Sequence, residues 1–414
     1  MTVLIIGAGI AGLTTALSLH QIGVDCRVFE SVETIEPLGV GINTLPHAVR
    51  ELTELGLADR LAATAIETAE LAYFSKQGAH IWSEPRGVAA GYRWPQFSVH
   101  RGTLQMLLLA AVQERLGADS VVPGHHLADW ESDADGVRAS FCDRRTGRSV
   151  GEARGSLLIA ADGIHSVARA RLYPDEGPPI WNGAILWRGV SLGQPFLTGR
   201  SMVMIGHEHQ KFVAYPIARD QPVINWIAEL KFRADHAWQR EDWNRRGSLD
   251  DFLPLFEDWR FDWLDVPALI RSAELCYEYP MVDRDPLPRW TFGPVTLLGD
   301  AAHAMYPIGS NGASQAILDA RVLAREIRAH GPTEAALAAY EAERRPATAA
   351  IVQANRQNGP DEVLEIVERR APDGFARIED VLSATELEDV AARYKRLAGF
   401  DKDALNSRRA IVGF

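Results

Sequence analysis

The chain has little cysteine, no excess of basic residues and no long apolar run, and each shortage excludes a class of protein. Its 414 residues include three cysteines, Cys26, Cys142 and Cys276, which lie far apart and match no metal-binding spacing. We therefore expect no disulfide framework and a reducing, cytoplasmic setting. The formal net charge of -12 argues against nucleic acid or an anionic membrane surface as the main partner. No targeting segment is recognisable at either end, and we expect no membrane association.

The remaining composition is that of an ordinary globular protein. Hydrophobic residues make up 47% of the chain and charged residues 24%. The length is sufficient for two or three domain-sized units. We find no internal repeat and no low-complexity run.

Residues 3–30 contain the pattern on which the rest of the interpretation depends. A short β-branched run precedes Gly7, Gly9 and Gly12, and a helical pattern then leads to a second strand that ends at Glu30. This order is that of a βαβ unit that binds a dinucleotide. Gly7 permits the tight turn, Gly9 lets the backbone approach a pyrophosphate, and Gly12 lets the helix pack closely on the strand. Glu30 follows the last glycine at close to the ~20-residue distance expected for the acid that accepts a hydrogen bond from a ribose hydroxyl.

The nearly uncharged residues 3–19 have a second interpretation, as a signal peptide or a membrane anchor. No basic segment precedes them, and the run is shorter than the ~20 residues that a membrane helix needs. Glycines at three motif positions also fit neither role. The motif identifies a dinucleotide but leaves open which one, because FAD, NAD and NADP all carry a pyrophosphate.

The rest of the chain divides into segments with helical and with strand patterns. Patterns predict a strand pair around Gly78, several strands with turns over residues 121–150, and a long helix after Gly312. Residues 180–290 contain recurrent strand-like segments and are dense in tryptophan, which predicts a mostly antiparallel sheet. Further helices are predicted over the following ranges: 48–55, 104–116, and 333–414 with breaks at Pro346, Pro360 and Pro372.

Two more stretches lead from an apolar strand into a glycine turn and a helix. The second stretch contains Asp162-Gly163-x-x-Ser166-x-x-Arg169, and the third contains Gly299-Asp300-Ala301-Ala302-His303, followed by Pro307, Gly309 and Gly312. Together with the first stretch they resemble the three fingerprints of the single-component FAD-dependent aromatic hydroxylases, the group that includes para-hydroxybenzoate and salicylate hydroxylases. Additional stretches, which are similar to the phenazine-modifying members of this group, are residues 37–43, 82–87, 100–102, 279–288 and 311–319.

The resemblance, which covers about residues 1–350, implies an α/β fold. It implies a Rossmann-like FAD-binding domain, an interleaved and mostly antiparallel substrate domain, and C-terminal helices. The expected boundaries are 1–69, 97–175 and 291–350 for the FAD-binding domain, 70–96 and 176–290 for the substrate domain, and 351–414 for the C-terminal helical segment.

The resemblance also implies noncovalent FAD. The residues expected to hold it are Gly7, Gly9, Ala11, Gly12, Glu30, Val40, Gly41, Arg101, Asp162, Arg169, Asp300, Pro307, Gly309, Asn311 and Gly312. Asp300 would accept from a ribityl hydroxyl, Arg101 would contact the phosphates, and N–H groups near Gly312 would face the flavin N1/O2 edge. Each has an ordinary alternative: Asp300 as a helix cap, Arg101 as a solvated surface residue, and Arg169 as part of a salt bridge that shapes its loop.

The chain has no second GxGxxG with a βαβ unit of its own. The resemblance therefore implies that NADH or NADPH docks transiently as a co-substrate. It implies that dioxygen adds to the reduced flavin as a C4a-hydroperoxide, which hydroxylates an electron-rich aromatic ring, with or without loss of a carboxylate. Because the flavin drives this chemistry, we assign no catalytic side chain.

The substrate is expected between the flavin and the second sheet. Candidate contacts are Trp187, Arg188, Met204, Tyr215, Asn225, Trp226 and Met281. An aromatic stripe at strand spacing is more often plain core, so these are individual hypotheses. Arg188, flanked by Trp187, is predicted to pair with an aromatic carboxylate.

Other histidines and other functions remain as alternatives. His207-x-His209 and the pair at 125–126 lack further ligand spacing, and we interpret them as surface residues, with no metal site. His303 is interpreted as a structural histidine at a helix start. Two other functions are a flavin oxidase or reductase of the same fold, and a non-catalytic binding module of the GDP-dissociation-inhibitor type. The expected partners are a small aromatic substrate, dioxygen and NAD(P)H, and a homodimer is an open prediction.

Overall fold

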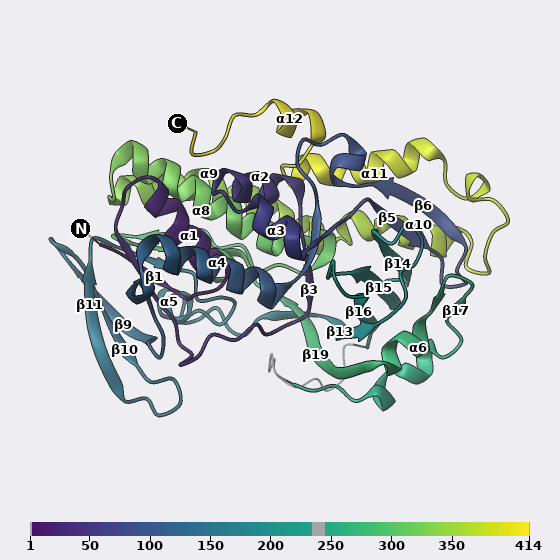
Figure 1. Ribbon diagram of the computed structural model, residues 1–414, viewed down its shortest axis with the longest axis horizontal. Coiled ribbons are helices and arrows are strands. Elements are labelled where there is room, and N and C mark those ends of the chain that lie inside the picture. Colours follow the sequence, from purple (N-terminus) through teal and green to yellow (C-terminus); the bar gives the residue numbers. More distant parts are fainter. Residues whose placement is uncertain (1, 234–244, 414) are drawn as a thin grey trace.

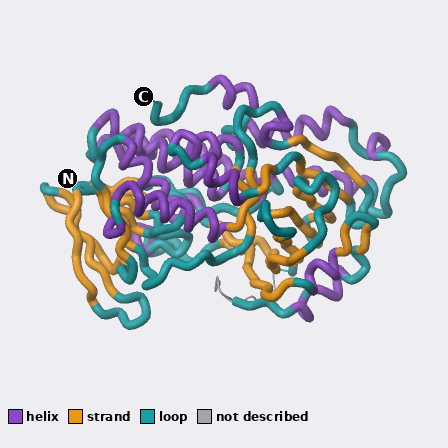
Figure 2. The backbone as a smooth tube through the Cα atoms, in the orientation of Figure 1, coloured by secondary structure: helices purple, strands orange, loops and turns teal. Residues whose placement is uncertain are grey.

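A computed structural model of the chain describes residues 2–233 and 245–413. A helix-rich part that contains the N-terminus lies beside a sheet-rich part along the long axis of the molecule (Figure 1). The tube view shows the same division: many helices lie in the upper region of the first part, and a group of strands lies in the second part (Figure 2). Within the described residues, no helix is long and apolar enough to cross a membrane.

The first part is built on a sheet whose central strands are parallel. Its strand order is β20 (Thr291–Phe292), β21 (Val295–Leu297), β12 (Leu157–Ala160), β1 (Val3–Ile6), β2 (Cys26–Phe29) and β8 (Val121–Val122). The two middle strands, β1 and β12, are apolar and buried along their whole length, as expected in a parallel sheet covered on both faces. The predicted strand, glycine turn, helix and strand at the N-terminus are confirmed as β1, α1 (Ile10–Gln21) and β2.

Helices and a small sheet cover this parallel sheet. Helix α1 lies between α4 (Arg101–Leu116) and α8 (Gly312–His330), and α9 (Glu334–Arg356) packs on α8. The small antiparallel sheet β9 (His126–Asp133), β10 (Gly136–Cys142) and β11 (Ser149–Gly155) contributes Phe141, whose ring stacks on Phe29 of β2. These elements share one hydrophobic core.

The second part is a seven-stranded, mostly antiparallel sheet. Its order is β19 (Ala273–Asp283), β13 (Ile180–Leu192), β16 (Val223–Lys231), β15 (Gln210–Pro216), β14 (Ser201–His207), β5 (Glu70–Phe74) and β6 (His80–Pro85). Only the β14–β5 pair among these described strands is parallel. Strands β5 and β6 precede most of the first part in sequence yet lie in this sheet, so the chain crosses between the two parts more than once.

Short elements connect the two parts and complete the covering layers. A three-stranded sheet of β3 (Gly41–Thr44), β7 (Phe97–His100) and β4 (Ile66–Glu67) lies where the parts meet. Before the C-terminal segment, the other α-helices and strands are α2 (Pro46–Glu54), α3 (Ala58–Thr64), α5 (Val167–Leu172), β17 (Arg260–Phe261), β18 (Leu264–Asp265), α6 (Val266–Arg271) and α7 (Asp300–His303).

The C-terminal segment forms α10 (Glu362–Arg370), α11 (Ala384–Leu397) and α12 (Lys402–Ser407). Figure 1 shows α10 and α11 over the second sheet, after which the chain returns across the first part. Pro360 and Pro372 lie between helices as expected, but the predicted break at Pro346 is wrong, because Pro346 lies inside α9. Buried side chains on both sides of it, such as Tyr340 and Ile351, hold the helix in place although the proline lacks a donor.

Candidate active site

The first glycine turn has the shape that the motif predicts. Gly7 has a φ of +98°, and a Cβ built there would lie 2.6 Å from the carbonyl oxygen of Ala161. A Cβ at Gly12 would lie 1.9 Å from the carbonyl oxygen of Gly7. No atom lies within 4 Å of the Cβ position of Gly9. The turn is therefore closely packed at Gly7 and Gly12 but leaves free space beside Gly9. The N-terminus of α1, which no side chain caps, is therefore accessible to an anion.

Glu30 lies at the end of β2 and contacts the same turn. Its Oε2 accepts a hydrogen bond from the backbone N–H of Ala8 at 2.8 Å. Its Oε1 accepts from the Ser31 hydroxyl at 2.9 Å and from the Val32 N–H at 3.0 Å. The carboxylate is therefore fixed beside the glycine turn, and Oε2 keeps room for a further donor.

Helix α4 brings Arg101 and a residue that the sequence analysis missed to this turn. Gln105 donates from Nε2 to the Ala8 carbonyl at 2.8 Å. Arg101, one turn earlier, donates its backbone N–H to the carbonyl of Val40 at 2.9 Å. Its guanidinium is exposed and makes no hydrogen bond or ion pair with the described residues. The four-residue spacing of the two side chains on one helix face is the signal by which Gln105 was detectable.

Asp162 contributes a buried acceptor that lacks a donor. Its Oδ2 accepts from the backbone N–H of Val167 at 2.8 Å, whereas Oδ1 is buried and without a partner among the described residues. Burial raises the pKa of this carboxyl, and hydrogen bonds from Ser166 and the start of α5 act against the rise. A buried acceptor without a partner next to a nucleotide-type turn indicates a ligand donor at this place.

Asp300 is the first residue of α7. Desolvation by the surrounding protein raises the pKa of Asp300, and the charges of His303 and Arg101 act against that rise. The side chain nevertheless keeps open surface. A carboxyl that is both desolvated and accessible lies in a recess and not on a convex face.

Arg169 is a structural clamp. It is 1% exposed, and its five N–H donors are all used by protein acceptors. These acceptors are the Glu176 carboxylate, the carbonyls of Ala301 and Ala302 in α7, and the carbonyl of Asp285. It therefore acts on a ligand only through α7, which is the loop-shaping alternative considered for it.

His303 belongs to a buried network behind α7. Its Nε2 lies 2.5 Å from Oδ2 of Asp319, whose other oxygen accepts from Nε of Arg344 at 2.7 Å. Oδ2 of Asp319 also accepts from the N–H of Gly299 at 3.2 Å. Burial alone would raise the pKa of Asp319, but His303 and Arg344 outweigh it and the pKa is lowered. This network fixes the turn that presents Asp300.

The turn at residues 307–312 lies at the start of α8. Pro307 is exposed, Gly309 has a φ of +72°, and Asn311 is fully buried. Gly312 is the first residue of α8, with no side-chain cap and no atom within 4 Å of its Cβ position. The free N–H groups of this helix start are accessible, as at α1.

Three candidate substrate residues converge on Gly41, a candidate cofactor residue. The Gly41 carbonyl accepts from Nη2 of Arg188 and from the Tyr215 hydroxyl, each at 2.8 Å. The Gly41 N–H donates to Oδ1 of Asn225 at 2.7 Å. Two buried donors, Nε of Arg188 and Nδ2 of Asn225, have no partner among the described residues. Burial raises the pKa of Tyr215 to about 12, and Arg188 acts against that rise.

The structure separates the two tryptophans from this group. Trp187 and Trp226 point to the other face of the sheet, where Trp187 stacks on Phe252 and Trp226 donates to the Ser191 hydroxyl at 2.8 Å. The reason is the two-residue period of a strand, which places Arg188 and Asn225 on the opposite face from their tryptophan neighbours.

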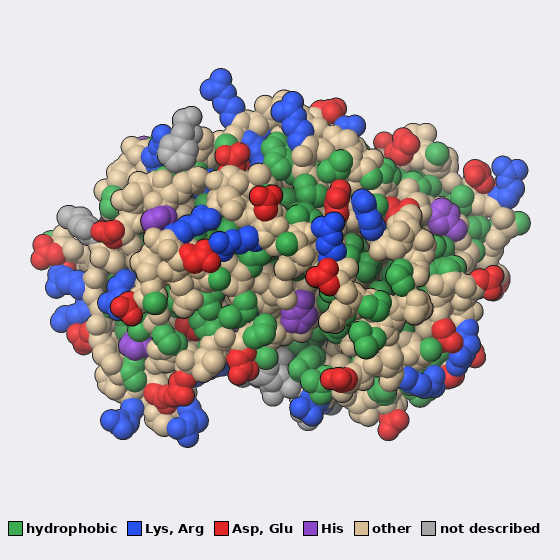
Figure 3. Space-filling model, in the orientation of Figure 1, with side chains coloured by type: hydrophobic (Ala, Val, Ile, Leu, Met, Phe, Trp, Pro, Cys, Tyr) green, Lys and Arg blue, Asp and Glu red, His purple; other side chains and the backbone are tan. Residues whose placement is uncertain are grey.

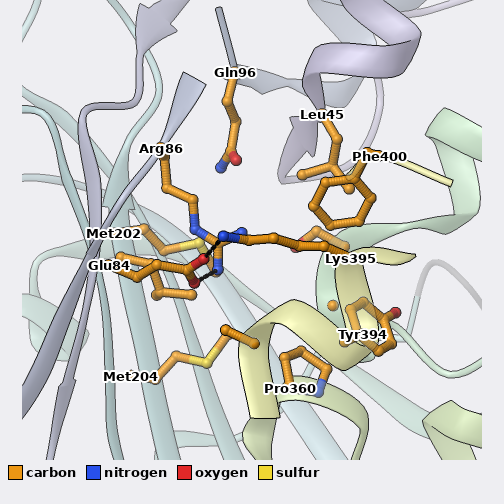
Figure 4. A pocket seen from close by; sticks show the side chains of 14 residues that line it. Leu45, Glu84, Arg86, Gln96, Met202, Met204, Pro360, Tyr394, Lys395 and Phe400 are labelled. Carbon is orange, nitrogen blue, oxygen red and sulfur yellow. Dashed lines mark ion pairs between the residues drawn. The ribbon is translucent and has the colours of Figure 1, made fainter. Parts of the chain in front are cut away.

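The two methionines lie on the same sheet face as Arg188, in different places. Met281 packs with Tyr306 and Ile308, next to the 307–312 turn. Met204 lines a small cavity between β14 and the C-terminal segment (Figure 4). In that cavity Nη2 of Arg86 lies 2.7 Å from Oε2 of Glu84, which Lys395 also contacts.

The residues fit an FAD. The open positions at Gly9 and Gly312, the unpartnered Oδ1 of Asp162 and the recessed Asp300 supply N–H donors for phosphate and acceptors for hydroxyl groups. Among the described residues, no group of three or more His, Cys, Asp or Glu side chains could hold a metal ion. The fold and the site define a dinucleotide-binding protein.

A family model described as "FAD binding domain" matches residues 1–355, and the chain belongs to this family. It is 47% identical over 389 residues to phenazine 1,6-dicarboxylic acid hydroxylase PhzS of Lysobacter antibioticus, over 92% of this chain and 95% of that one. It is 32% identical to 3-amino-4-hydroxybenzoate 2-monooxygenase PtnB3 of Streptomyces platensis, over 98% and 97% of the two chains. A crystal structure of a Klebsiella pneumoniae HpxO variant complexed with FAD matches with a TM-score of 0.71 and 25% sequence identity. The match covers 96% of this chain and 94% of that chain.

These findings confirm the predicted class. The protein is a single-component FAD-dependent aromatic monooxygenase that uses NAD(P)H, and the oxidase, reductase and binding-module alternatives are not supported. The predicted α/β fold, with an antiparallel sheet beside the FAD-binding fold and helices at the C-terminus, is confirmed as well.

Proposed function

We propose that this enzyme hydroxylates a flat, electron-rich heteroaromatic acid of the phenazine carboxylate type. The observation that carries the proposal is the pair of buried donors, Nε of Arg188 and Nδ2 of Asn225, beside Gly41. Buried donors without acceptors are costly, and a substrate carboxylate supplies acceptors with the geometry that a guanidinium prefers. The 47% identity to a phenazine dicarboxylate hydroxylase supports a phenazine-type ring.

In this proposal the substrate ring lies against the sheet face that carries Arg188, Tyr215 and Met281, and Met204 lies at its far edge. The two tryptophans do not take part, because they point into the opposite core. Bound FAD supplies the activation of dioxygen and an electrophilic oxygen for ring hydroxylation. The chain's own groups orient the ring, exclude water and neutralise the carboxylate.

The cofactor contacts belong to the same proposal. The start of α1 with Gly7, Gly9, Ala11 and Gly12 would hold the pyrophosphate, with Arg101 as a second contact to phosphate. Glu30 would accept from the ribose and Asp300 from the ribityl chain, while Val40, Gly41 and the 307–312 turn would border the flavin ring. Asp162 would accept from a donor of the bound nucleotide, and Arg169 would support α7.

Charged side chains of both signs are interspersed on the face of the molecule seen in Figure 3, without a large patch of one sign.

The location and the oligomeric state of the enzyme are two finer predictions of the proposal. We infer a cytoplasmic enzyme, from the scattered free cysteines, and a homodimer is the oligomeric state to test.

The test is NAD(P)H oxidation by the yellow holoenzyme across phenazine, quinoline, phenol and aromatic-acid compounds under ¹⁸O₂. We expect a phenazine carboxylate to stimulate NAD(P)H oxidation and to yield a product with one ¹⁸O atom. If the carboxylate is on the attacked ring carbon, carbon dioxide is released. Stimulation only by compounds without a carboxylate would contradict the proposed substrate class.

A further inference from the structure

Tyr394 of α11 connects the C-terminal segment to the turn before α8. Its hydroxyl accepts from Nδ2 of Asn311 at 3.0 Å and donates to Oδ1 of Asn355, 2.9 Å away. The carbonyl of Ile308 lies 3.3 Å from the same oxygen. Tyr394 is 5% exposed and lies at the edge of the cavity in Figure 4. Burial raises its pKa, and the hydrogen bond from Asn311 acts against that rise.

The turn that Tyr394 contacts has an unusual backbone. Gly309 has a φ of +72°, and Ser310, which is not a glycine, has a φ of 56°. A non-glycine residue in this region persists only where its surroundings hold it. The Cβ position of Gly309 lies 2.2 Å from the Tyr394 hydroxyl oxygen, so the tyrosine packs directly on the glycine.

A second set of bonds fixes Asn311 from the same side. Its Oδ1 accepts from Nε2 of Gln315 at 3.2 Å, and Gln315 also donates to the Ala398 carbonyl at 3.0 Å. Asn355 donates from Nδ2 to the Tyr306 carbonyl at 3.0 Å. Residues from α9 and α11 thus hold both ends of the turn, immediately before the free N–H groups of α8.

We propose that Tyr394 is a positioning residue that sets the conformation of the 308–312 turn and, through it, the electrostatics at the flavin ring. This inference rests on the proposed contact of the 307–312 turn with FAD. Tyr394 lies beyond the region 1–355 that matches the family model, so this contact to the turn comes from outside the shared FAD-binding region. N–H groups at a helix start stabilise negative charge, and their orientation therefore affects how readily the flavin accepts electrons.

The experiment compares Tyr394→Phe with the matched control Tyr92→Phe. Tyr92 is 6% exposed, and its hydroxyl donates to the Phe400 carbonyl at 2.7 Å, so it also anchors the C-terminal segment. Among the residues that the structure describes, Tyr92 makes no hydrogen bond to the 308–312 turn. Both variants lose one buried tyrosine hydroxyl, and we expect similar falls in melting temperature.

The distinguishing measurement is the midpoint potential of the bound flavin, taken without substrate. We expect Tyr394→Phe to shift it to a more negative value and to raise severalfold the share of NAD(P)H oxidised without hydroxylated product. Tyr92→Phe should match wild type in the midpoint potential and in the share of NAD(P)H oxidised without product. Asn355→Ser removes the acceptor of the Tyr394 hydroxyl and should shift the potential in the same direction. This variant tests the same role if Tyr394→Phe does not fold.

The outcomes separate this inference from the proposed substrate. A potential in Tyr394→Phe or Asn355→Ser equal to that of Tyr92→Phe would overturn the positioning role. Wild-type enzyme that holds FAD but hydroxylates no phenazine carboxylate would overturn the substrate proposal alone, because the potential is measured without substrate. Wild-type protein that binds no FAD would overturn both.

Discussion

Nη2 of Arg188 donates a hydrogen bond to the carbonyl of Gly41 at 2.8 Å, across 147 positions of sequence. Arg188 lies in β13 of the second sheet, and Gly41 begins β3, where the two parts of the molecule meet. Tyr215 and Asn225 bind the same glycine. The residues that we propose for substrate binding are thus hydrogen-bonded to the start of β3, which we propose to border the flavin.

The first prediction concerns the Arg188 side chain. Arg188→Met should weaken binding of a carboxylated substrate far more than binding of its decarboxylated analogue, because a charge-assisted hydrogen bond is lost. Such a bond is worth about 1.5–3 kcal/mol, or roughly a 10- to 150-fold change in affinity. Titration of both compounds, followed by flavin fluorescence, measures the difference.

The matched control for Arg188 is Arg219. Arg219 also donates to a backbone carbonyl, that of Ala62 at 2.9 Å, but it is exposed. Arg219→Met should leave both affinities near those of wild type. Equal losses for the two compounds in Arg188→Met would rule Arg188 out as the carboxylate anchor.

The second prediction is that two substitutions lose FAD for different reasons. Gly9→Val places a branched side chain at the open position where a pyrophosphate approaches the backbone. Asp300→Ala removes an acceptor for the ribityl chain, a loss of about 1.5–3 kcal/mol. Gly23→Ala, at a glycine with open space around it but a φ of +75°, is a control for backbone effects alone. Flavin content equal to wild type in both variants would refute the two assignments.

The third prediction is that FAD is bound without a covalent bond. The sequence resemblance places no cysteine or histidine where a flavin is attached. The three cysteines are free, and two of them, Cys26 and Cys276, are buried in the core, where burial raises the pKa of their thiols. Acid precipitation should therefore release the yellow colour into the supernatant. Colour that remains in the protein pellet would contradict this.

The sequence predicted the first part of the fold well because its signals are local. The strand, glycine turn and helix around Gly7 and Gly12 are set by close backbone approaches that admit no side chain, and such constraints are visible in a single sequence. The strand pair around Gly78 was equally clear, since this glycine has a φ of +82° in the turn between β5 and β6.

The elements that were missed depend on distant packing. Pro346 was expected to end a helix, but buried neighbours on α9 keep the helix continuous. The direction of Trp187 and Trp226 was not predictable, because both faces of the second sheet are covered and the strands lack a clear polar face. Tyr394 is hydrogen-bonded to Asn311, 83 positions away in the sequence, and no local sequence pattern predicts such a bond.

The last prediction concerns Glu365 of α10, which joins the C-terminal segment to the second sheet. Its Oε1 accepts from the backbone N–H of Glu208 at 2.5 Å. Burial, together with the negative charge of Glu208, raises the pKa of Glu365 from its usual 4.5 to about 7, and the N–H of Glu208 acts against the rise. Because the folded pKa is raised, the stability linked to protonation of Glu365 is fully present below pH 4.5 and is lost as the pH rises through about 7.

Glu365→Gln removes this titration and keeps an acceptor for the Glu208 N–H. The variant should therefore melt at a higher temperature than wild type at pH 8, and the difference should shrink towards pH 5. The gain at pH 8 is at most about 3 kcal/mol, because one pKa unit corresponds to 1.36 kcal/mol and the side chain is only partly buried. Glu388→Gln, at an exposed position on α11, is the control and should show no such trend. A Glu365→Gln variant whose melting temperature runs parallel to that of wild type from pH 5 to pH 8 would show that Glu365 does not titrate in this range.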